Sequence, residues 1–88
     1  MLLIYLTDPE HVDAVWRLGA VPIELHSRIR SLPRDWITRG RVTALLRCDA
    51  VLVGQTELTP DERASATAAK MNVFRSVSAL EKWIAGVP

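Results

Sequence analysis

The sequence predicts a small α/β domain in which four short strands form one parallel sheet with helices on both of its faces. Three observations lead to this class. Short apolar segments alternate with segments of helical periodicity along the chain, as they do in β-α units. The strand segments are apolar at nearly every position, which is typical of strands buried on both faces. Capping and turn residues such as Asp8-Pro9, Gly19 and Thr59-Pro60 separate these segments.

The first strand is predicted at residues 2–6, because this segment is apolar throughout and Thr7-Asp8-Pro9 follows it. Asp8 suits the N-cap of a helix, and Pro9 suits its first position because proline has no N–H to leave unpaired. That helix is expected to end at Gly19 in the left-handed conformation. Its predicted apolar face consists of Val12, Val15 and Trp16.

The middle of the chain predicts a second strand, a second helix and a third strand. The second strand is expected at residues 21–25, where Pro22 favours an edge position because proline cannot donate to a neighbouring strand. A basic loop at residues 26–32 leads to a helix over residues 33–46. One face of this helix carries Thr38, Val42, Leu45 and Leu46. The third strand is expected at residues 50–53, after a turn at Cys48-Asp49.

The last part of the chain predicts two helices with a short strand between them. The segment Thr59-Pro60-Asp61-Glu62 predicts a helix start with a capping box, and this helix is expected to end near Lys70. A strand at Val73-Phe74 follows. Ser78 to Glu81 reads as a second capping box, which would open the last helix. The apolar stripe of that helix consists of Leu80, Trp83, Ile84 and Val87.

Residues 1–88 are therefore predicted to be a single domain with the element order β-α-β-α-β-α-β-α. Right-handed crossover connections would give the strand order 2-1-3-4, with a topological switch point between the first and third strands. This is a shortened, flavodoxin-like three-layer sandwich. Ligands of open α/β sheets bind at such switch points, beyond the carboxyl ends of the strands.

Composition limits the class of protein. The chain is 49% hydrophobic and 24% charged, which is ordinary for a globular domain. A chain of this length has a thin core, which self-association would help to stabilise. It has no run of about 18 apolar residues, and its first residues lack the basic leader of a signal peptide. With the single cysteine, Cys48, this makes the cytoplasm the expected location.

The charges are unevenly distributed along the chain. Residues 28–47 contain six arginines and one aspartate, for a local balance of +5, whereas residues 48–62 contain four acidic residues and no base. A basic segment beside an acidic one could steer a phosphorylated ligand or dock a partner. The alternative is that both segments are solvated surfaces.

The residues expected at the switch point define the candidate site. Its ligand-binding residues are predicted to be Thr7, Asp8, Gly54, Gln55 and Thr59. Glu62 has two interpretations. In the first, its carboxylate folds back to the Thr59 N–H as part of the capping box. In the second, the carboxylate lies at the mouth of the crevice and acts as nucleophile or base on a sugar carbon.

The other candidate residues are expected to have structural or interface roles. Cys48 is expected to be a core residue, because it opens a buried strand beside an acid. Asp49 is expected to hold the turn, with ligand binding as the alternative. The two histidines lie far apart without ligand spacing, so neither a metal nor another cofactor is predicted. An exposed Trp36 beside Arg39 predicts an interface, and with the thin core and an alanine-rich third helix it predicts a homodimer.

The chain resembles the nucleoside 2-deoxyribosyltransferase-like superfamily, in particular its compact, poorly characterised bacterial and phage members. Tyr5-Leu6-Thr7-Asp8-Pro9 stands where that family has its first-strand motif. The segment from Trp36 to Arg41 is similar to its tryptophan-containing basic helix. Leu46-Arg47-Cys48-Asp49-Ala50-Val51 is similar to its strand motif with an aspartate. Glu62 and Ala66 fall on its E-x-x-x-A helix motif.

This resemblance implies that Glu62 attacks the anomeric carbon of a deoxyribosyl group and that residues near the first strand help to hold that group. Two differences stand out. Thr56-Glu57-Leu58-Thr59 replaces a serine-x-glycine-alanine motif, and Asp8 replaces a glycine. The leading hypothesis is a protein that binds nucleosides or nucleotides, with weak N-glycoside hydrolase activity. The alternative is a non-enzymatic protein, phage-encoded and acting on a host protein, that keeps the fold without an active pocket. No P-loop, G-x-G-x-x-G motif or nucleic-acid-binding module is present in the sequence.

Overall fold

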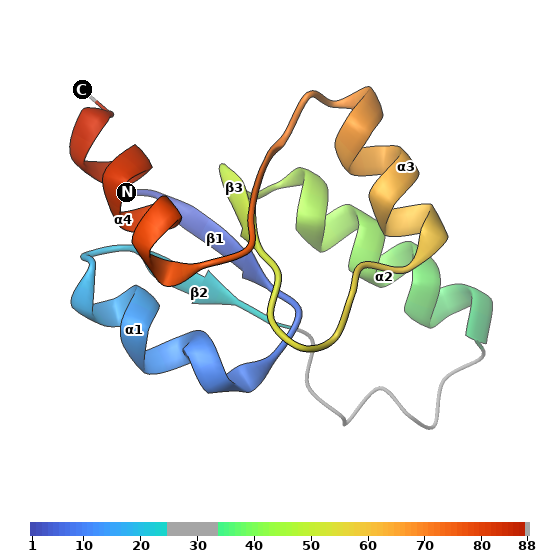
Figure 1. Cartoon of the computed structure of the whole chain (residues 1–88). Coiled ribbons are helices and arrows are strands. Elements are labelled where there is room, and N and C mark those ends of the chain that lie inside the picture. The colour runs from blue at the N-terminus through green and yellow to red at the C-terminus, as the bar shows by residue number, and fades with distance from the viewer. Residues whose placement is uncertain (25–33, 88) are drawn as a thin grey trace.

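A computed structural model describes the backbone of residues 1–24 and 34–87, and the side chains of residues 1–24 and 39–87. The helices and strands alternate along the chain (Figure 1). In order they are β1 (Leu3–Leu6), the 3-10 helix η1 (Pro9–His11), α1 (Val12–Arg17), β2 (Val21–Ile23), α2 (Arg34–Leu46), β3 (Ala50–Leu52), α3 (Pro60–Ala68), β4 (Asn72–Phe74) and α4 (Val77–Gly86).

The four strands form one parallel sheet in the order β2-β1-β3-β4. This confirms the predicted sheet and strand order. Tyr5 of β1 lies opposite Ile23 on one side and Val51 on the other, so β1 and β3 occupy the centre. The edge strand β2 contains Pro22, as predicted. The second edge strand is β4, in which Val73 lies opposite Val51.

Alternation along the strands divides the core between the two faces of the sheet. One cluster joins Ile4, Leu6 and Leu52 to Val15 of α1 and Leu80 of α4. A second cluster contains the intervening strand residues and side chains of α2 and α3, including Tyr5, Val51, Val53, Leu45 and Ala66. Figure 1 shows α1 with α4 on one side of the sheet and α2 with α3 on the other. The predicted three layers are therefore present.

Two residues predicted on core-facing helical faces are exposed instead. Trp16 is 56% exposed and Leu46 is 48% exposed. Each follows a fully buried residue, Val15 or Leu45, and successive residues lie about 100° apart around a helix. α1 has only six helical residues. Only the side of this helix that carries Val15 packs against the core, so the neighbouring Trp16 side chain stays exposed.

The observed helix ends correct two predictions and confirm others. Gly19 has a φ of +80° after α1, as expected of a left-handed C-terminal glycine. Asp8 precedes η1, but its side chain makes no capping hydrogen bond there. The last helix is capped by Ser76, whose Oγ accepts the Ala79 N–H at 3.2 Å, so the capping box predicted at Ser78 is wrong. The capping box at the start of α3 is confirmed.

Candidate functional site

The predicted switch point is held together by hydrogen bonds between the end of β1 and the loop after β3. The Gly54 N–H donates to Thr7 Oγ1 at 2.8 Å. The Thr56 N–H donates to Asp8 Oδ2 at 2.8 Å. Hydrogen bonds from the Thr56 side chain and backbone lower the pKa of the Asp8 carboxyl, with a smaller contribution from the Gln55 N–H. Asp8 is therefore an anionic acceptor for the amides of this loop.

Gly54 permits this contact because it has no side chain. A Cβ at this position would overlap Asp8 Oδ2 and lie 3.1 Å from Asp8 Cβ. The residue is thus needed for the close approach of the loop to β1. Thr7, Asp8 and Gly54 were predicted to bind a ligand, and the structure brings all three together. The side chains of Thr7 and Asp8 accept hydrogen bonds from the Gly54 and Thr56 N–H groups.

Glu62 is buried, with only 3% of its surface exposed. Both of its carboxylate oxygens accept hydrogen bonds. Its Oε1 accepts the Thr59 N–H at 3.1 Å, and its own N–H donates to Thr59 Oγ1 at 3.2 Å. Its Oε2 accepts the hydroxyl of Tyr5 at 2.5 Å. The capping interpretation is confirmed, and the same side chain also makes a buried contact with β1.

Tyr5 is the donor that orients this carboxylate. Burial, followed by the hydrogen bond to Glu62 and the charge of that residue, raises the pKa of the Tyr5 phenol well above its ordinary value. The hydroxyl therefore stays protonated and donates a hydrogen bond to Glu62 Oε2. Since a carboxylate has about four lone-pair positions, these two hydrogen bonds leave acceptor positions on Glu62 for a third group.

A small pocket lies beside Glu62 and has a volume of about 110 Å³. Its lining residues are Tyr5, Leu6, Thr7, Pro9, Glu24, Arg41, Thr56, Glu57 and Glu62. Thr7 and Glu62 were predicted here. The predicted residues Asp8, Gly54, Gln55 and Thr59 are not in this lining. Drug-sized ligands occupy pockets of at least about 300 Å³, so this pocket has room for one ring of a ligand.

Sequence reasoning missed several residues of the pocket, above all Tyr5 and Arg41. Tyr5 carries the only hydroxyl in an otherwise apolar strand, and this signal could have identified it. Its spacing of two residues from Thr7 also puts both side chains on one face of the strand. Arg41 and Glu24 reach the pocket through the packing of α2 and the end of β2. No local sequence pattern indicates that convergence.

Glu57 fixes the outer part of the same loop. Its Oε2 accepts Arg75 Nη1 at 2.7 Å, and its Oε1 lies 3.6 Å from Arg63 Nη2. The hydrogen bond from Arg75 is the main reason that the pKa of the Glu57 carboxyl is lowered. The loop wall of the pocket is thus held by Thr7 and Asp8 at one end and by Arg75 and Arg63 at the other.

Two further candidates, Cys48 and Asp49, make hydrogen bonds that hold the fold together. Cys48 is buried, and burial raises the pKa of its thiol to about 11. Its Sγ donates to the Ala44 carbonyl at 3.2 Å, so it is an unreactive core thiol as predicted. Asp49 Oδ2 accepts the Leu3 N–H at 2.7 Å, and its own N–H donates to the Leu3 carbonyl at 2.8 Å. Asp49 therefore joins the turn to β1.

The described part of the chain, residues 1–24 and 34–87, offers neither a cluster of metal ligands nor a membrane-spanning helix. There, no three His, Cys, Asp or Glu side chains gather in a group that could hold a metal ion. The helices of residues 1–24 and 34–87 are all too short or too polar to cross a bilayer.

The predicted interface residues lie on α2. The side chain of Trp36 is outside the described residues. Arg39 is exposed and lines an open hollow with Gly40, Thr43, Ala44 and Arg47. The homodimer stays a prediction.

Comparison of the chain with protein-family models, curated proteins and solved structures found no match. The resemblance to the deoxyribosyltransferase-like superfamily also stays a prediction.

Proposed function

We propose that the protein binds a nucleoside or nucleotide by its deoxyribose in the pocket beside Glu62, and that it hydrolyses the N-glycosidic bond weakly. One observation carries this proposal: a buried glutamate, fixed by Tyr5 and Thr59, lines a small pocket at the carboxyl end of β1. A held carboxylate with free acceptor positions is the group that glycosyl transfer requires.

The size and charge of the pocket favour nucleosides over their phosphates. A volume of about 110 Å³ holds the sugar, while the base and the 5′ substituent extend outside. Glu24, Glu57 and Glu62 line the pocket with one arginine, Arg41, and Glu57 is also paired with Arg75 and Arg63. The loop amides that could cradle a phosphate already donate to Thr7 and Asp8. A neutral sugar with hydroxyl donors suits these acceptors better than an anion.

The chemistry follows from the position of Glu62. One carboxylate oxygen attacks C1′ of the deoxyribose, the C1′–N bond breaks, and its electron pair leaves with the base, which takes a proton from water. A second water molecule then adds to C1′ and the bond from C1′ to the Glu62 oxygen breaks, which releases the sugar and restores the carboxylate. The proton lost by this water neutralises the hydroxide left by the first. The Tyr5 hydroxyl keeps the carboxylate in place, and its hydrogen bond to Oε2 also makes that oxygen a weaker nucleophile. This is one reason to expect slow turnover.

The test is incubation with pooled deoxynucleosides and, separately, with deoxynucleoside monophosphates, followed by chromatography for free base and by thermal shift. We expect slow base release from deoxynucleosides, with little dependence on the base. Glu62→Gln should abolish release and keep the fold, because glutamine also completes a capping box. Absence of both base release and thermal shift with every compound would reject the proposal.

A non-enzymatic interaction protein is the second candidate, and one observation favours it. Glu62 is almost fully enclosed, and the predicted ligand-binding side chains Thr7 and Asp8 accept hydrogen bonds from the protein's own loop. The same assay separates the two candidates. If Glu62 only caps α3 and orients Tyr5, then Glu62→Gln changes no activity, because the wild type has none.

A further inference from the structure

The described lining of the pocket beside Glu62 contains one basic side chain, that of Arg41. Arg41 lies one helical turn before Leu45 in α2, and side chains four positions apart share a helix face. Leu45 is fully buried in the cluster between α2 and the sheet. The helix therefore directs Arg41 toward the sheet, and the pocket lies where this side chain meets the end of β1.

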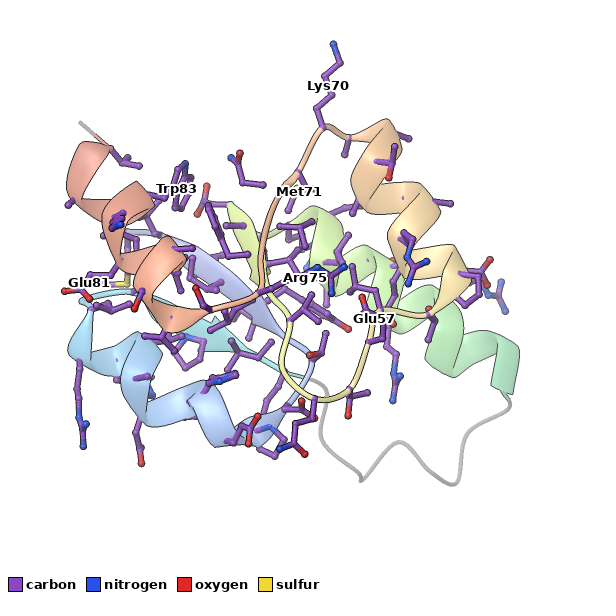
Figure 2. The ribbon with its side chains drawn as sticks, in the orientation of Figure 1. Glu57, Lys70, Met71, Arg75, Glu81 and Trp83 are labelled. Atoms are coloured by element: carbon purple, nitrogen blue, oxygen red, sulfur yellow. The ribbon has the colours of Figure 1, made fainter. Side chains whose placement is uncertain are left out.

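The Arg41 guanidinium has no partner in the part of the chain whose side chains are described. The Glu62 oxygens accept hydrogen bonds from β1 and from the N-cap of α3. Glu57 accepts Arg75 Nη1 at 2.7 Å, and Figure 2 shows these two side chains beside each other. Within residues 1–24 and 39–87, no hydrogen bond or ion pair involves the Arg41 side chain. Its five N–H donors are thus available to a ligand.

Arg41 lies nearer to solvent than Glu62 does. Glu62 is buried, whereas Arg41 is half-buried. Burial is the main cause of the raised pKa of the Tyr5 phenol, and the charge of Arg41 acts in the opposite direction, so the guanidinium acts on the same end of the pocket as Glu62. With the deoxyribose in the pocket, the base extends toward solvent. The base is therefore the part of the substrate that Arg41 faces.

The bases of DNA share an acceptor that matches this donor. Each has one beside the glycosidic bond, O2 in pyrimidines and N3 in purines, and arginine reads this edge when it enters the minor groove. When the C1′–N bond breaks, its electron pair passes to the base, and part of the negative charge reaches O2 or N3. A fixed cation beside that atom stabilises the transition state more than the bound substrate.

We propose that Arg41 donates to the O2 or N3 acceptor of the base and stabilises the charge that this atom gains as the C1′–N bond breaks. The inference rests on the proposed function, because it requires the sugar to lie beside Glu62. It defines the substrates as deoxynucleosides with an acceptor beside the glycosidic bond, whichever base carries it. Arg41 transfers no proton and stays charged throughout, and the base takes its proton from water.

The test compares 2′-deoxyadenosine with its 3-deaza analogue, in which a C–H group replaces N3. Isothermal titration calorimetry measures binding of both nucleosides to the Glu62→Gln variant, with and without Arg41→Met. Methionine keeps an unbranched side chain of high helix propensity and removes the donors. Arg41→Met should weaken binding of deoxyadenosine at least about tenfold, through loss of a hydrogen bond from a charged group. Binding of the 3-deaza analogue should not change.

Two further variants show whether the effect belongs to the pocket and to the guanidinium. Arg47→Met removes another arginine of α2, which lines a separate open hollow, and it should bind deoxyadenosine as the parent does. Arg41→Lys keeps the charge without the planar fork of donors and should give an intermediate affinity. With Glu62 intact, Arg41→Met should slow adenine release more than it weakens binding, because the charge on N3 grows in the transition state. Circular dichroism checks that each variant is folded.

The outcomes separate this inference from the proposed function. If Arg41→Met weakens binding of both nucleosides equally, or of neither, while the wild type still releases adenine, the role of Arg41 is overturned and the proposed function stands. If the protein binds neither nucleoside and releases no base, both are rejected. A loss confined to the nucleoside that has N3 supports Arg41 as the residue that recognises the base.

Discussion

Two regions of the molecule lie on opposite sides of β3: the switch point between β1 and β3, and the outer edge of the sheet at β4. They differ in whether their main-chain donors and acceptors already have partners within the protein. At the switch point, the Gly54 and Thr56 amides donate to Thr7 and Asp8. At the β4 edge, main-chain groups alternate in direction along the strand, and those of Val73 point away from the sheet. Ligands can bind at a topological switch point. Here, however, side chains of the protein itself accept hydrogen bonds from the main-chain N–H groups that a ligand would use.

The difference begins with one residue at the end of β1. The Asp8 carboxylate accepts loop amides that an anionic ligand would otherwise use, and Gly54 allows it to come close. The pocket that remains beside Glu62 is therefore small and rich in acceptors. This favours a neutral sugar over an anion at the switch point.

The largest effect is expected at Glu62, whose carboxylate joins α3 to β1. Glu62→Ala would leave the Tyr5 hydroxyl and the Thr59 N–H without their acceptor. We expect a loss of about 2–4 kcal/mol in the free energy of unfolding, measured by urea denaturation. Glu62→Gln is the matched control and should cost less than about 1 kcal/mol. Equal losses in the two variants would show that the switch point is not closed by these hydrogen bonds.

The fold could be predicted because its signals are local. The alternation of apolar strands with capped helices indicated the sheet, and Thr59-x-x-Glu62 indicated the start of α3. Thr7 and Glu62 could be placed at the switch point because strand ends of a parallel sheet share one edge. Trp16 was misplaced, since a short helix on a thin core buries fewer side chains than its pattern suggests.

The rest of the site depends on distances between elements, which no local pattern encodes. The hydrogen bond from Tyr5 to Glu62 joins residues 57 positions apart in the sequence. Its existence depends on how α3 lies over β1. Asp8 looked like a helix cap, but its carboxylate accepts the Thr56 N–H, 48 positions away.

An intermediate effect is expected where the loop meets β1. In Gly54→Ala the new Cβ would press on Asp8, and we expect a loss of about 1–2 kcal/mol of stability by overpacking. Asp8→Gly removes the opposing side chain, so the double variant should recover most of the loss attributable to Gly54→Ala. A double-mutant cycle in urea measures this coupling. Additive effects would mean that the loop and β1 do not constrain each other.

The smallest effect is expected at the β4 edge and has the opposite sign. Lys70 follows α3 with a φ of 56°, a left-handed conformation that glycine adopts without steric cost. Lys70→Gly should therefore stabilise the fold by about 0.5–1 kcal/mol in urea unfolding, whereas Lys70→Ala retains the Cβ and should bring no such gain. If Lys70→Gly is instead destabilising, the lysine side chain supports the fold, and the edge is less open than the arrangement of β4 indicates.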